Sequence, residues 1–426
     1  MKANIGVIGL GYVGLPLSVE FGKYFHTIGF DINENRIEDL KKNRDKNFEV
    51  SKSDFIKSKK LLFSSDIADL KKCNIYIIAV PTPKNIKKEP DLNPLKKVSK
   101  QVASILKYND IVIYESTVYP GVTEEICVPI LEKYSGLKYL KSDKKSKGFY
   151  CGYSPERINP GDKKNHFTKI VKIIAGSSPK TEKRINLIYS KIISAGTFAV
   201  SSIRAAEAVK VVENVQRDIN IGLMNELAII FNILNLNIDE ILNAAETKWN
   251  FSSFRPGLVG GHCIGVDPYY LIHKSIKEGY RPKFIESARV LNDNMARYVA
   301  DQTMKLIKSK KKSKLNILIM GLAYKENTPD IRNSLVFEIY SYLKKNYRSN
   351  VSIYDPIVDQ LEAFNEYKIK LLENIDNQKY DAIIFAVSHN WFKKMGIKKI
   401  RKHLKKDGIL YDVKHAFSIK DTEGRL

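Results

Sequence analysis

Short apolar runs alternate with longer charged segments along the first half of the chain. The first run, Asn4–Ile8, leads into a glycine-rich turn and then into an apolar helical pattern through Leu17 and Phe21. Further β-rich runs are separated by segments long enough for helices and lie at residues 26–30, 74–80, 110–114, 149–153 and 170–175. This alternation predicts a parallel, doubly wound α/β sheet.

A long helix is expected after this sheet. No proline interrupts residues 180–255, and residues 203–246 carry apolar side chains at helical spacing, namely Val209, Val212, Ile219, Leu223, Leu227 and Ile230. A single glycine, Gly222, is tolerated within such a pattern. We therefore predict a helix of roughly 30 residues, of the kind that connects domains or pairs with a second copy of itself.

The strand and turn pattern restarts after a lysine-rich linker at residues 308–314. Apolar runs at 315–320, 351–355, 382–387 and 409–411 repeat the first organisation loosely. A chain of 426 residues has room for two or three domains. We expect an N-terminal domain over 1–200, a central helical domain over 201–300 and a smaller C-terminal α/β domain over 315–426.

Composition and charge exclude several classes of protein. With 43% hydrophobic and 28% charged residues, the chain is typical of a globular protein and not of a disordered or membrane-embedded one. The apolar stretch after Lys2 lacks a signal-peptide cleavage site, so we expect a cytoplasmic protein. The net charge of +24 raises the alternative of a nucleic-acid-binding protein. However, aromatic residues are not interleaved with the lysine runs and no nucleic-acid motif is present.

The four cysteines show neither a metal-binding spacing nor a disulfide framework. Cys73 and Cys127 lie in apolar segments, as buried thiols do. Cys263 differs, because it lies in a loop with four glycines within nine residues, beside His262 and near Asp267. Such surroundings favour a nucleophile. Adjacent residues such as His262 and Cys263 rarely bind one ion, so no metal site is expected.

The turn Gly9-x-Gly11-x-x-Gly14 follows a strand and opens a helix, and Asp31 ends the next strand. These features predict dinucleotide binding, because glycines let the backbone approach a pyrophosphate at the helix N-terminus. Asp31 would accept hydrogen bonds from a ribose diol and repel a 2′-phosphate, which favours NAD over NADP. We assign the neighbouring Tyr12, Val13 and Arg36 to the same cofactor site.

Other polar residues follow the ends of predicted strands, where open parallel sheets bind their ligands. Two such ends carry candidate cofactor residues: Pro81, Thr82, Ser116 and Thr117. Alternatively, the two threonines cap the helices that follow. Glu156 comes just after the run at 149–153, and Lys210 and Asn214 share one face of the long helix. From its apolar neighbours alone, Lys210 would be expected to extend its charge to solvent.

In order and over nearly the whole chain, these motifs resemble the nucleotide-sugar 6-dehydrogenases. The resemblance rests on six segments: 9–14, 115–117, 154–157, Lys210 with Asn214, 260–263 and 321–332. That family includes UDP-glucose dehydrogenase. The resemblance implies two Rossmann-like doubly wound domains joined by a long central helix and helical segment, a homodimer formed around that helix, and oxidation of a sugar C6 alcohol to a carboxylate with two NAD.

The resemblance also implies roles for individual residues. Cys263 matches the nucleophile that forms a thiohemiacetal and then a thioester with the substrate. Lys210 and Asn214 match oxyanion-stabilising residues, Asp267 matches a carboxylate that tunes the lysine or orients water, and Glu156 with Thr117 matches the base in thioester hydrolysis. Arg332 matches an arginine near the cofactor. The implied substrate-binding residues are Glu156, Arg157, Lys210, Asn214, Arg255, Gly260 and Lys325.

The nucleophile segment also bears on the substrate. UDP-glucose dehydrogenases usually read Gly-Gly-Ser-Cys-Phe-Pro-Lys-Asp, whereas residues 260–267 read Gly-Gly-His-Cys-Ile-Gly-Val-Asp. This segment is most similar to that of the UDP-N-acetylhexosamine 6-dehydrogenases of Vi-antigen and O-antigen synthesis. The resemblance implies that the product is a UDP-sugar precursor of surface polysaccharide. The alternatives are UDP-glucose or UDP-N-acetylmannosamine as substrate, or a single-step dehydrogenase of the 6-phosphogluconate type in which the thiol is incidental.

Overall fold

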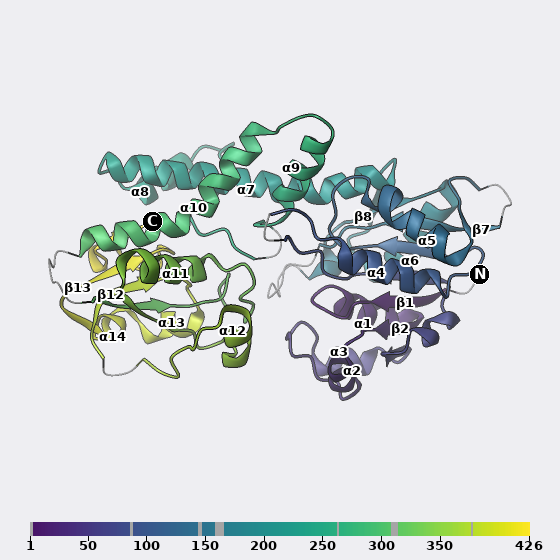
Figure 1. The fold of residues 1–426 in the computed structure, drawn as a ribbon, viewed down its shortest axis with the longest axis horizontal. Coiled ribbons are helices and arrows are strands. Elements are labelled where there is room, and N and C mark those ends of the chain that lie inside the picture. Colours follow the sequence, from purple (N-terminus) through teal and green to yellow (C-terminus); the bar gives the residue numbers. More distant parts are fainter. Residues whose placement is uncertain are drawn as a thin grey trace. The chain divides into compact units, whose positions relative to one another are not determined.

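The computed structural model describes residues 3–85, 88–143, 147–157, 166–261, 264–307, 314–375 and 378–426. The chain forms two compact units (Figure 1). The N-terminal unit comprises Met1–Glu213 and Tyr269–Tyr280, and the C-terminal unit comprises Asn214–Pro268 and Arg281–Leu426. Within the part of the chain described, none of the helices combines the length and apolar composition that a membrane span requires.

The sheet of the N-terminal unit has the order β3-β2-β1-β4-β5-β7-β8-β9, with β6 paired to β7. Its strands are β1 (Asn4–Ile8), β2 (His26–Phe30), β3 (Leu61–Ser64), β4 (Ile75–Ile78), β5 (Ile111–Tyr114), β6 (Lys138–Tyr139), β7 (Gly148–Tyr153), β8 (Lys172–Gly176) and β9 (Thr197–Ala199). The Rossmann-like parallel arrangement is confirmed from β3 through β7.

One pairing departs from the predicted parallel arrangement, because β8 pairs antiparallel with β7. A parallel connection needs a crossover of a dozen or more residues, usually a helix over one face of the sheet. The described residues between β7 and β8 contain only a short 3₁₀ turn, Phe167–Lys169. The chain therefore returns in the opposite direction beside β7.

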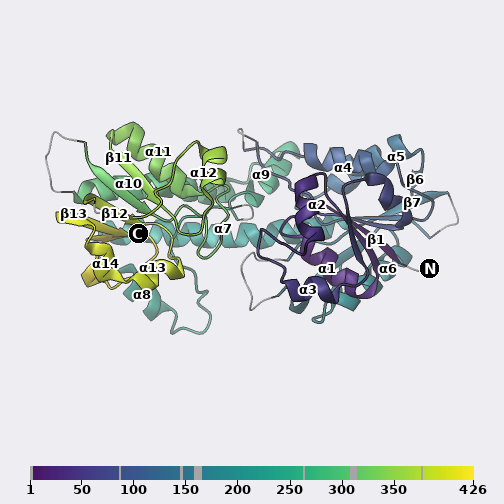
Figure 2. The same cartoon turned by 90° about the horizontal axis from the view of Figure 1, so that it is seen from below.

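Helices cover both faces of this sheet, with α1 and α6 on one side and α4 and α5 on the other (Figure 2). Leu17 and Phe21 of α1 and Ile185 of α6 pack in one core cluster with β1, β4 and β5. The helices of this unit are α1 (Gly14–Tyr24), α2 (Glu34–Lys41), α3 (Lys52–Lys57), α4 (Asn93–Ala103), α5 (Val128–Ser135) and α6 (Pro179–Ile192), with a 3₁₀ helix at Ile67–Lys72 and a π-helix at Thr123–Cys127. Buried apolar faces hold these helices on the strands.

The predicted long helix is present as α7 (Ile203–Ile233), which is 31 residues long. It is followed by α8 (Ile238–Ala245), α9 (Asp267–Lys277) and α10 (Lys283–Leu306). An added Cβ at Gly222 would lie 3.3 Å from the Cβ of Ala288, so glycine permits close packing of α7 on α10. Three of the apolar residues that predicted α7 are exposed and not core, namely Val212, Leu223 and Ile230.

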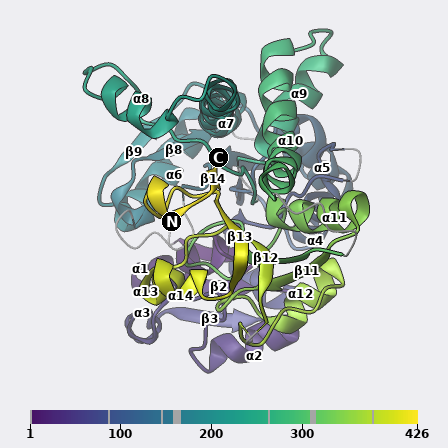
Figure 3. The ribbon, with the colours of Figure 1, turned by 90° about the vertical axis from the view of Figure 1, so that its left-hand side faces the viewer.

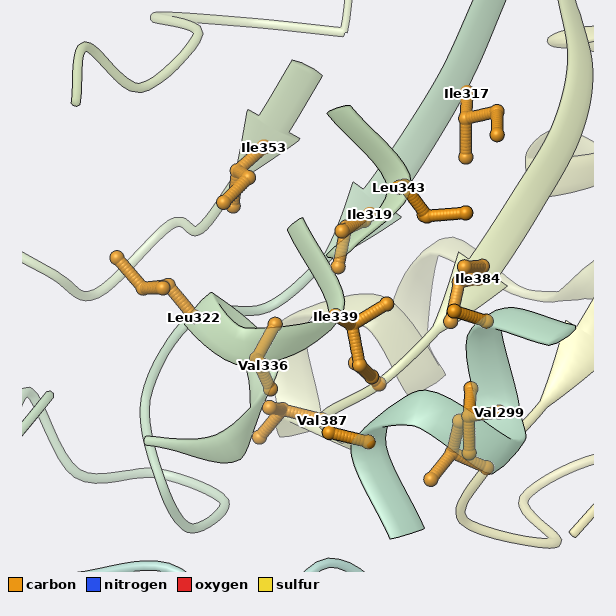
Figure 4. Close-up of a cluster of buried hydrophobic side chains, with 14 of the residues drawn as sticks. Val299, Ile317, Ile319, Leu322, Val336, Ile339, Leu343, Ile353, Ile384 and Val387 are labelled. Carbon is orange, nitrogen blue, oxygen red and sulfur yellow. The ribbon is translucent and has the colours of Figure 1, made fainter. Parts of the chain in front are cut away.

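The C-terminal unit contains a second parallel sheet with the order β11-β10-β12-β13-β14. Helices α10 and α11 lie on one side of it and α13 and α14 on the other (Figure 3). Branched aliphatic residues of α10, α11 and the strands, such as Val299, Ile319 and Ile339, fill the first interface (Figure 4). The remaining elements are β10 (Asn316–Met320), α11 (Leu335–Tyr347), β11 (Asn350–Tyr354), α12 (Gln360–Tyr367), β12 (Tyr380–Phe385), α13 (Asn390–Met395), α14 (Ile397–Arg401), β13 (Leu404–Asp412) and β14 (Gly424–Arg425).

Candidate active site

The glycine turn between β1 and α1 contains two glycines that packing requires and one that leaves room for a ligand. An added Cβ at Gly9 would lie 2.9 Å from the Ala79 carbonyl oxygen, and one at Gly14 would lie 1.8 Å from the Gly9 carbonyl oxygen. At Gly11 an added Cβ would meet no described atom within 4 Å. The Gly11 backbone therefore borders open space, as a pyrophosphate-binding turn requires. Tyr12 and Val13 complete this turn.

Asp31 and Arg36 both lie against this turn. Asp31 Oδ2 accepts the backbone N–H of Leu10 at 2.8 Å. Arg36 donates from Nε and Nη2 to the Leu10 carbonyl oxygen, both at 3.1 Å, and from Nη2 to Asp45 at 2.9 Å. The guanidinium is thus committed to groups of the protein, while Asp31 supplies negative charge at the end of β2. This arrangement suits a ribose diol better than a 2′-phosphate.

Hydrogen bonds join the strand ends that carry the other candidate cofactor residues. Thr82 Oγ1 donates to the Thr117 carbonyl oxygen at 2.7 Å, and Ser116 Oγ donates to the Val80 carbonyl oxygen at 2.7 Å. The Tyr270 hydroxyl of α9 donates to the Thr82 carbonyl oxygen. The alternative that Thr82 and Thr117 are helix caps is wrong, because the helical segments after them begin only at Asn93 and Thr123. Pro81 lies in the same segment as Thr82.

The structure brings Glu156 and Lys210 together in the N-terminal unit. Lys210 Nζ lies 3.0 Å from Glu156 Oε2, and their side chains are only 7% and 9% exposed, respectively. The other carboxylate oxygen, Glu156 Oε1, is buried and has no hydrogen-bond partner among the described residues. Arg157 forms an ion pair with Glu213, which lies on α7, the helix that also carries Lys210. The expectation that Lys210 extends to solvent, drawn from its apolar neighbours, is therefore wrong.

A buried ion pair that the sequence motifs did not identify contacts the residue before Glu156. Lys172 Nζ lies 2.8 Å from Glu115 Oε2 and donates to the Pro155 carbonyl oxygen, also at 2.8 Å. The Tyr189 hydroxyl donates to Glu115 Oε1. Burial raises the pKa of Glu115 and lowers the pKa of Lys172, and the charge of each partner opposes these shifts. A lysine at the start of the apolar run Lys172–Gly176 was the one available signal in the sequence.

Asn214 and Asp267 form a second buried pair, in the C-terminal unit. Asn214 Nδ2 donates to Asp267 Oδ2, and Arg217 donates to Asn214 Oδ1. Asn214 and Asp267 are 1% and 2% exposed. Asp267 is the first residue of α9, where a helix N-terminus favours negative charge. Asn214 lies four residues after Lys210 on the continuous helix α7, so the two side chains share a helix face.

A buried polar network holds both sides of the glycine loop at 257–264. Asn225 donates to the Gly257 carbonyl oxygen at 3.1 Å and accepts the Gly257 N–H at 2.8 Å. Arg289 donates to the Ile264 carbonyl oxygen at 3.4 Å and forms an ion pair with Asp218. His262 and the predicted nucleophile Cys263 lie outside the described residues, as does most of the linker at 308–314. The role of Cys263 therefore stays a prediction.

Gly260 and Lys325 line one small pocket in the C-terminal unit, together with residues such as Tyr324, Ser334 and Lys414. An added Cβ at Gly260 would lie 2.8 Å from the Asn333 carbonyl oxygen, so only glycine fits there without rearrangement. The structure thus joins two of the predicted substrate-binding residues in one cavity.

The C-terminal unit also has a turn after its first strand, β10, and the carboxylate that contacts this turn is Asp355. Asp355, at the end of β11, is only 6% exposed. It accepts the N–H groups of Leu322 and Ala323, and its Oδ2 lies 3.1 Å from Nε2 of buried His389. These bonds occupy Asp355 within the protein.

Two predicted site residues lie apart from that pocket. Arg255 is bound to Glu246 and Asn243 at the end of α8, and Arg332 is bound to Asp330. Neither lines the pocket formed by Gly260 and Lys325. Among the described residues, no group of three or more His, Cys, Asp and Glu side chains is placed to hold a metal ion.

The chain matches three successive segments of one protein family. Residues 3–193 match the NAD binding domain of the UDP-glucose/GDP-mannose dehydrogenase family, residues 204–294 match its central domain, and residues 318–419 match its UDP binding domain. The match follows the order of the sequence motifs.

Individual relatives extend over the whole chain. UDP-N-acetyl-D-glucosamine 6-dehydrogenase from Salmonella typhi is 51% identical over 430 residues, which cover 100% of this chain and 99% of the relative. The protein of the same name from Pseudomonas aeruginosa is 48% identical, with 99% of each chain covered. Among solved structures, UDP-D-ManNAc dehydrogenase from Pyrococcus horikoshii superposes with a TM-score of 0.86 at 29% identity, covering 98% of this chain and 96% of the other. The chain is therefore a member of the UDP-glucose/GDP-mannose dehydrogenase family and an NAD-dependent oxidoreductase.

Proposed function

We propose that this enzyme oxidises the C6 alcohol of UDP-N-acetylglucosamine to the carboxylate and so supplies a precursor of surface polysaccharide. The observation that carries this proposal is the 51% identity, over the entire chain, to a relative named UDP-N-acetyl-D-glucosamine 6-dehydrogenase. The nucleophile segment at 260–267, which differs from that of UDP-glucose dehydrogenases, supports the same substrate class.

The proposed reaction is a four-electron oxidation. One alcohol, two NAD⁺ and one water give one carboxylate, two NADH and three protons. Gly9, Gly11, Gly14, Asp31 and the strand ends at 81–82 and 116–117 would hold NAD⁺. When bound, each of the two NAD⁺ molecules would accept one of the two hydrides that C6 loses. The Cys263 thiolate adds to the C6 aldehyde to give a thiohemiacetal, which becomes a thioester on the second oxidation. Water then displaces the thiolate and releases the uronate.

Charged and polar groups on α7 fit the stabilisation of this chemistry. The Lys210 ammonium and the Asn214 amide would donate hydrogen bonds to the C6 oxygen as it becomes negative. Asp267 orients Asn214 through the bond between them. Glu156, with Thr117, would remove a proton from the attacking water. The buried oxygen Oε1 of Glu156, which has no partner among the described residues, supports this assignment because it can accept that hydrogen bond.

We also propose how the rest of the chain serves this reaction. Gly260 and Lys325, which line one pocket of the C-terminal unit, would contact the UDP-sugar. Arg157 and Arg255 would also contribute to substrate binding, and the functional division would follow residues 1–200, 201–300 and 315–426. A homodimer through α7 is supported by its exposed apolar residues, among them Val212, Leu223, Ile230 and Ile233. Burying such residues against a second copy would remove apolar surface from water. A cytoplasmic location stays a prediction from the sequence.

The substrate is tested by measuring NADH formation with UDP-N-acetylglucosamine, UDP-N-acetylgalactosamine, UDP-N-acetylmannosamine and UDP-glucose under identical conditions. We expect the highest kcat/KM for UDP-N-acetylglucosamine. A clear preference for any of the other three would overturn the substrate proposal and leave the family unchanged.

A further inference from the structure

Among the described residues of the N-terminal unit, Lys172 and Glu115 form the most completely buried ion pair, yet the proposed reaction assigns them no role. Their side chains are 4% and 0% exposed. The pair extends to α6, because the Tyr189 hydroxyl donates to Glu115 and its ring centroid lies 5.3 Å from the Lys172 ammonium. Three elements of the unit therefore meet at this pair: β8, the end of β5 and α6.

Stability alone is a weak explanation for such a pair. Removing two charges from water is costly, and well-packed apolar residues of similar size often stabilise a protein as well or better. The contact that distinguishes this pair is the third one. Lys172 donates to the Pro155 carbonyl oxygen, and that carbonyl belongs to the peptide that leads directly into Glu156.

Two hydrogen bonds of Ser154 also hold the segment before Glu156 against the neighbouring strands. The Ser154 N–H donates to the Tyr114 carbonyl oxygen at 3.0 Å, and Ser154 Oγ donates to the Ile173 carbonyl oxygen at 2.8 Å. Pro155 has no N–H and a restricted φ, so its carbonyl is its one backbone attachment point. The bond from Lys172 therefore positions the backbone of Glu156, and the contact with Lys210 positions the Glu156 carboxylate.

We propose that Lys172 and Glu115 are positioning residues for thioester hydrolysis, holding the Pro155–Glu156 peptide so that the Glu156 carboxylate stays beside Lys210 with one oxygen available to water. This inference rests on the proposed function, in which Glu156 is the base in that step. Glu115 directs Lys172 at the carbonyl, and Tyr189 holds Glu115. The pair itself takes no proton from the substrate or the water.

The test separates hydrolysis from the oxidation steps. Enzyme is mixed with NAD⁺ and UDP-N-acetylglucosamine, and NADH formation is followed through the first turnover and into steady state. Acid-quenched enzyme is then analysed by mass spectrometry for the thioester adduct. The informative variants are Glu156→Gln and the double variant Lys172→Met with Glu115→Gln, which leaves no unpaired buried charge. Tyr189→Phe perturbs the same pair more mildly and serves if the double variant does not fold. Lys169→Met removes an exposed lysine three residues before Lys172 and is the matched control.

We expect the double variant to retain the first-turnover burst of NADH, to accumulate the thioester and to turn over at least about tenfold more slowly, because a positioned base contributes about 10²- to 10⁴-fold. Tyr189→Phe should show the same pattern to a smaller extent, and Lys169→Met should match the wild type. If Glu156→Gln accumulates thioester but the double variant and Tyr189→Phe do not, the positioning role is refuted and the proposed function stands. If the burst and the steady state fall together, the pair is merely structural. If Glu156→Gln itself accumulates no thioester, both the assigned base and this inference are wrong.

Discussion

The ammonium of Lys210 lies 3.0 Å from the carboxylate of Glu156, and neither side chain is more than 9% exposed. In this position each charge compensates the other in a site largely removed from water. Removal of one partner therefore leaves the other as an uncompensated buried charge, which is far more disruptive than loss of an exposed ion pair. The pair also places a cation and a proton acceptor side by side, as oxyanion stabilisation followed by hydrolysis requires.

Replacing Lys210 with methionine should lower kcat by about 10²- to 10³-fold, the range for loss of one preorganised oxyanion donor. The KM for the UDP-sugar should change much less, because the lost interaction strengthens only as charge develops on the C6 oxygen. Steady-state kinetics with both substrates measures this. Lys191→Met, which removes an exposed lysine of α6, is the control. A fall in kcat of less than threefold for Lys210→Met would exclude Lys210 from the oxidation steps.

Asn214 and Asp267 should behave as one functional unit, because Asn214 donates to Asp267 within a buried pair. Asn214→Ala and Asp267→Asn are each expected to reduce kcat. The double variant should be little worse than the more severe single variant, since contacting residues are rarely additive. A double-mutant cycle on kcat measures the coupling. Fully additive losses would show that the two residues act independently.

The glycine turn offers a matched pair of substitutions. Gly11→Ala places its methyl group in open space, so thermal stability should be unchanged while the KM for NAD⁺ rises at least about tenfold, because the backbone can no longer approach the pyrophosphate. Gly14→Ala places its methyl group 1.8 Å from the Gly9 carbonyl oxygen and should lower both the Tm and NAD⁺ binding. Unchanged NAD⁺ binding in a folded Gly11→Ala variant would place the dinucleotide elsewhere.

Glu207 makes stability depend on pH. Its carboxylate accepts the N–H groups of Gly121 at 2.6 Å and Thr123 at 2.9 Å, and burial raises its pKa to about 7. Between its ordinary pKa of 4.5 and about 7, the native protein holds a proton that the unfolded chain has lost, so stability falls as pH rises through this window. The shift corresponds to a contribution of at most about 3 kcal/mol.

Glu207→Gln cannot ionise, so its Tm relative to the wild type should increase from pH 5 to about pH 7 and level off above it. Glu226→Gln, on an exposed position of the same helix, should show no such trend. Differential scanning fluorimetry across this pH range gives both comparisons. A Tm difference for Glu207→Gln that is independent of pH would contradict the raised pKa.

Local patterns predicted most of the fold and missed the edges of the first sheet. The strands β3 and β9 were not predicted, because they are short and at the edge of the sheet, where Leu62 and Phe198 are 68% and 60% exposed and the apolar pattern is weak. The antiparallel direction of β8 depends on the connection that precedes it and not on the composition of β8. The inner strands, by contrast, are buried on both faces and show as continuous apolar runs.

The candidate site divides in the same way. The glycine turn and Asp31 were recognisable because all their determinants lie within one β-α-β unit. The environment of Lys210 could not be recognised from the sequence, since Glu156 is 54 residues away and the neighbours of Lys210 in sequence are apolar. Lys172 was missed for the same reason, with Glu115 57 residues distant. Long-range ion pairs leave no periodic signal in a single sequence.

The proposed four-electron oxidation through Cys263 is tested by the NADH yield per molecule of UDP-N-acetylglucosamine consumed. We expect two NADH per sugar and a UDP-uronate as the product, with Cys263→Ser unable to form the uronate at more than a small fraction of the wild-type rate. One NADH per sugar with release of an aldehyde, or a Cys263→Ser variant that makes the uronate at the wild-type rate, would contradict it.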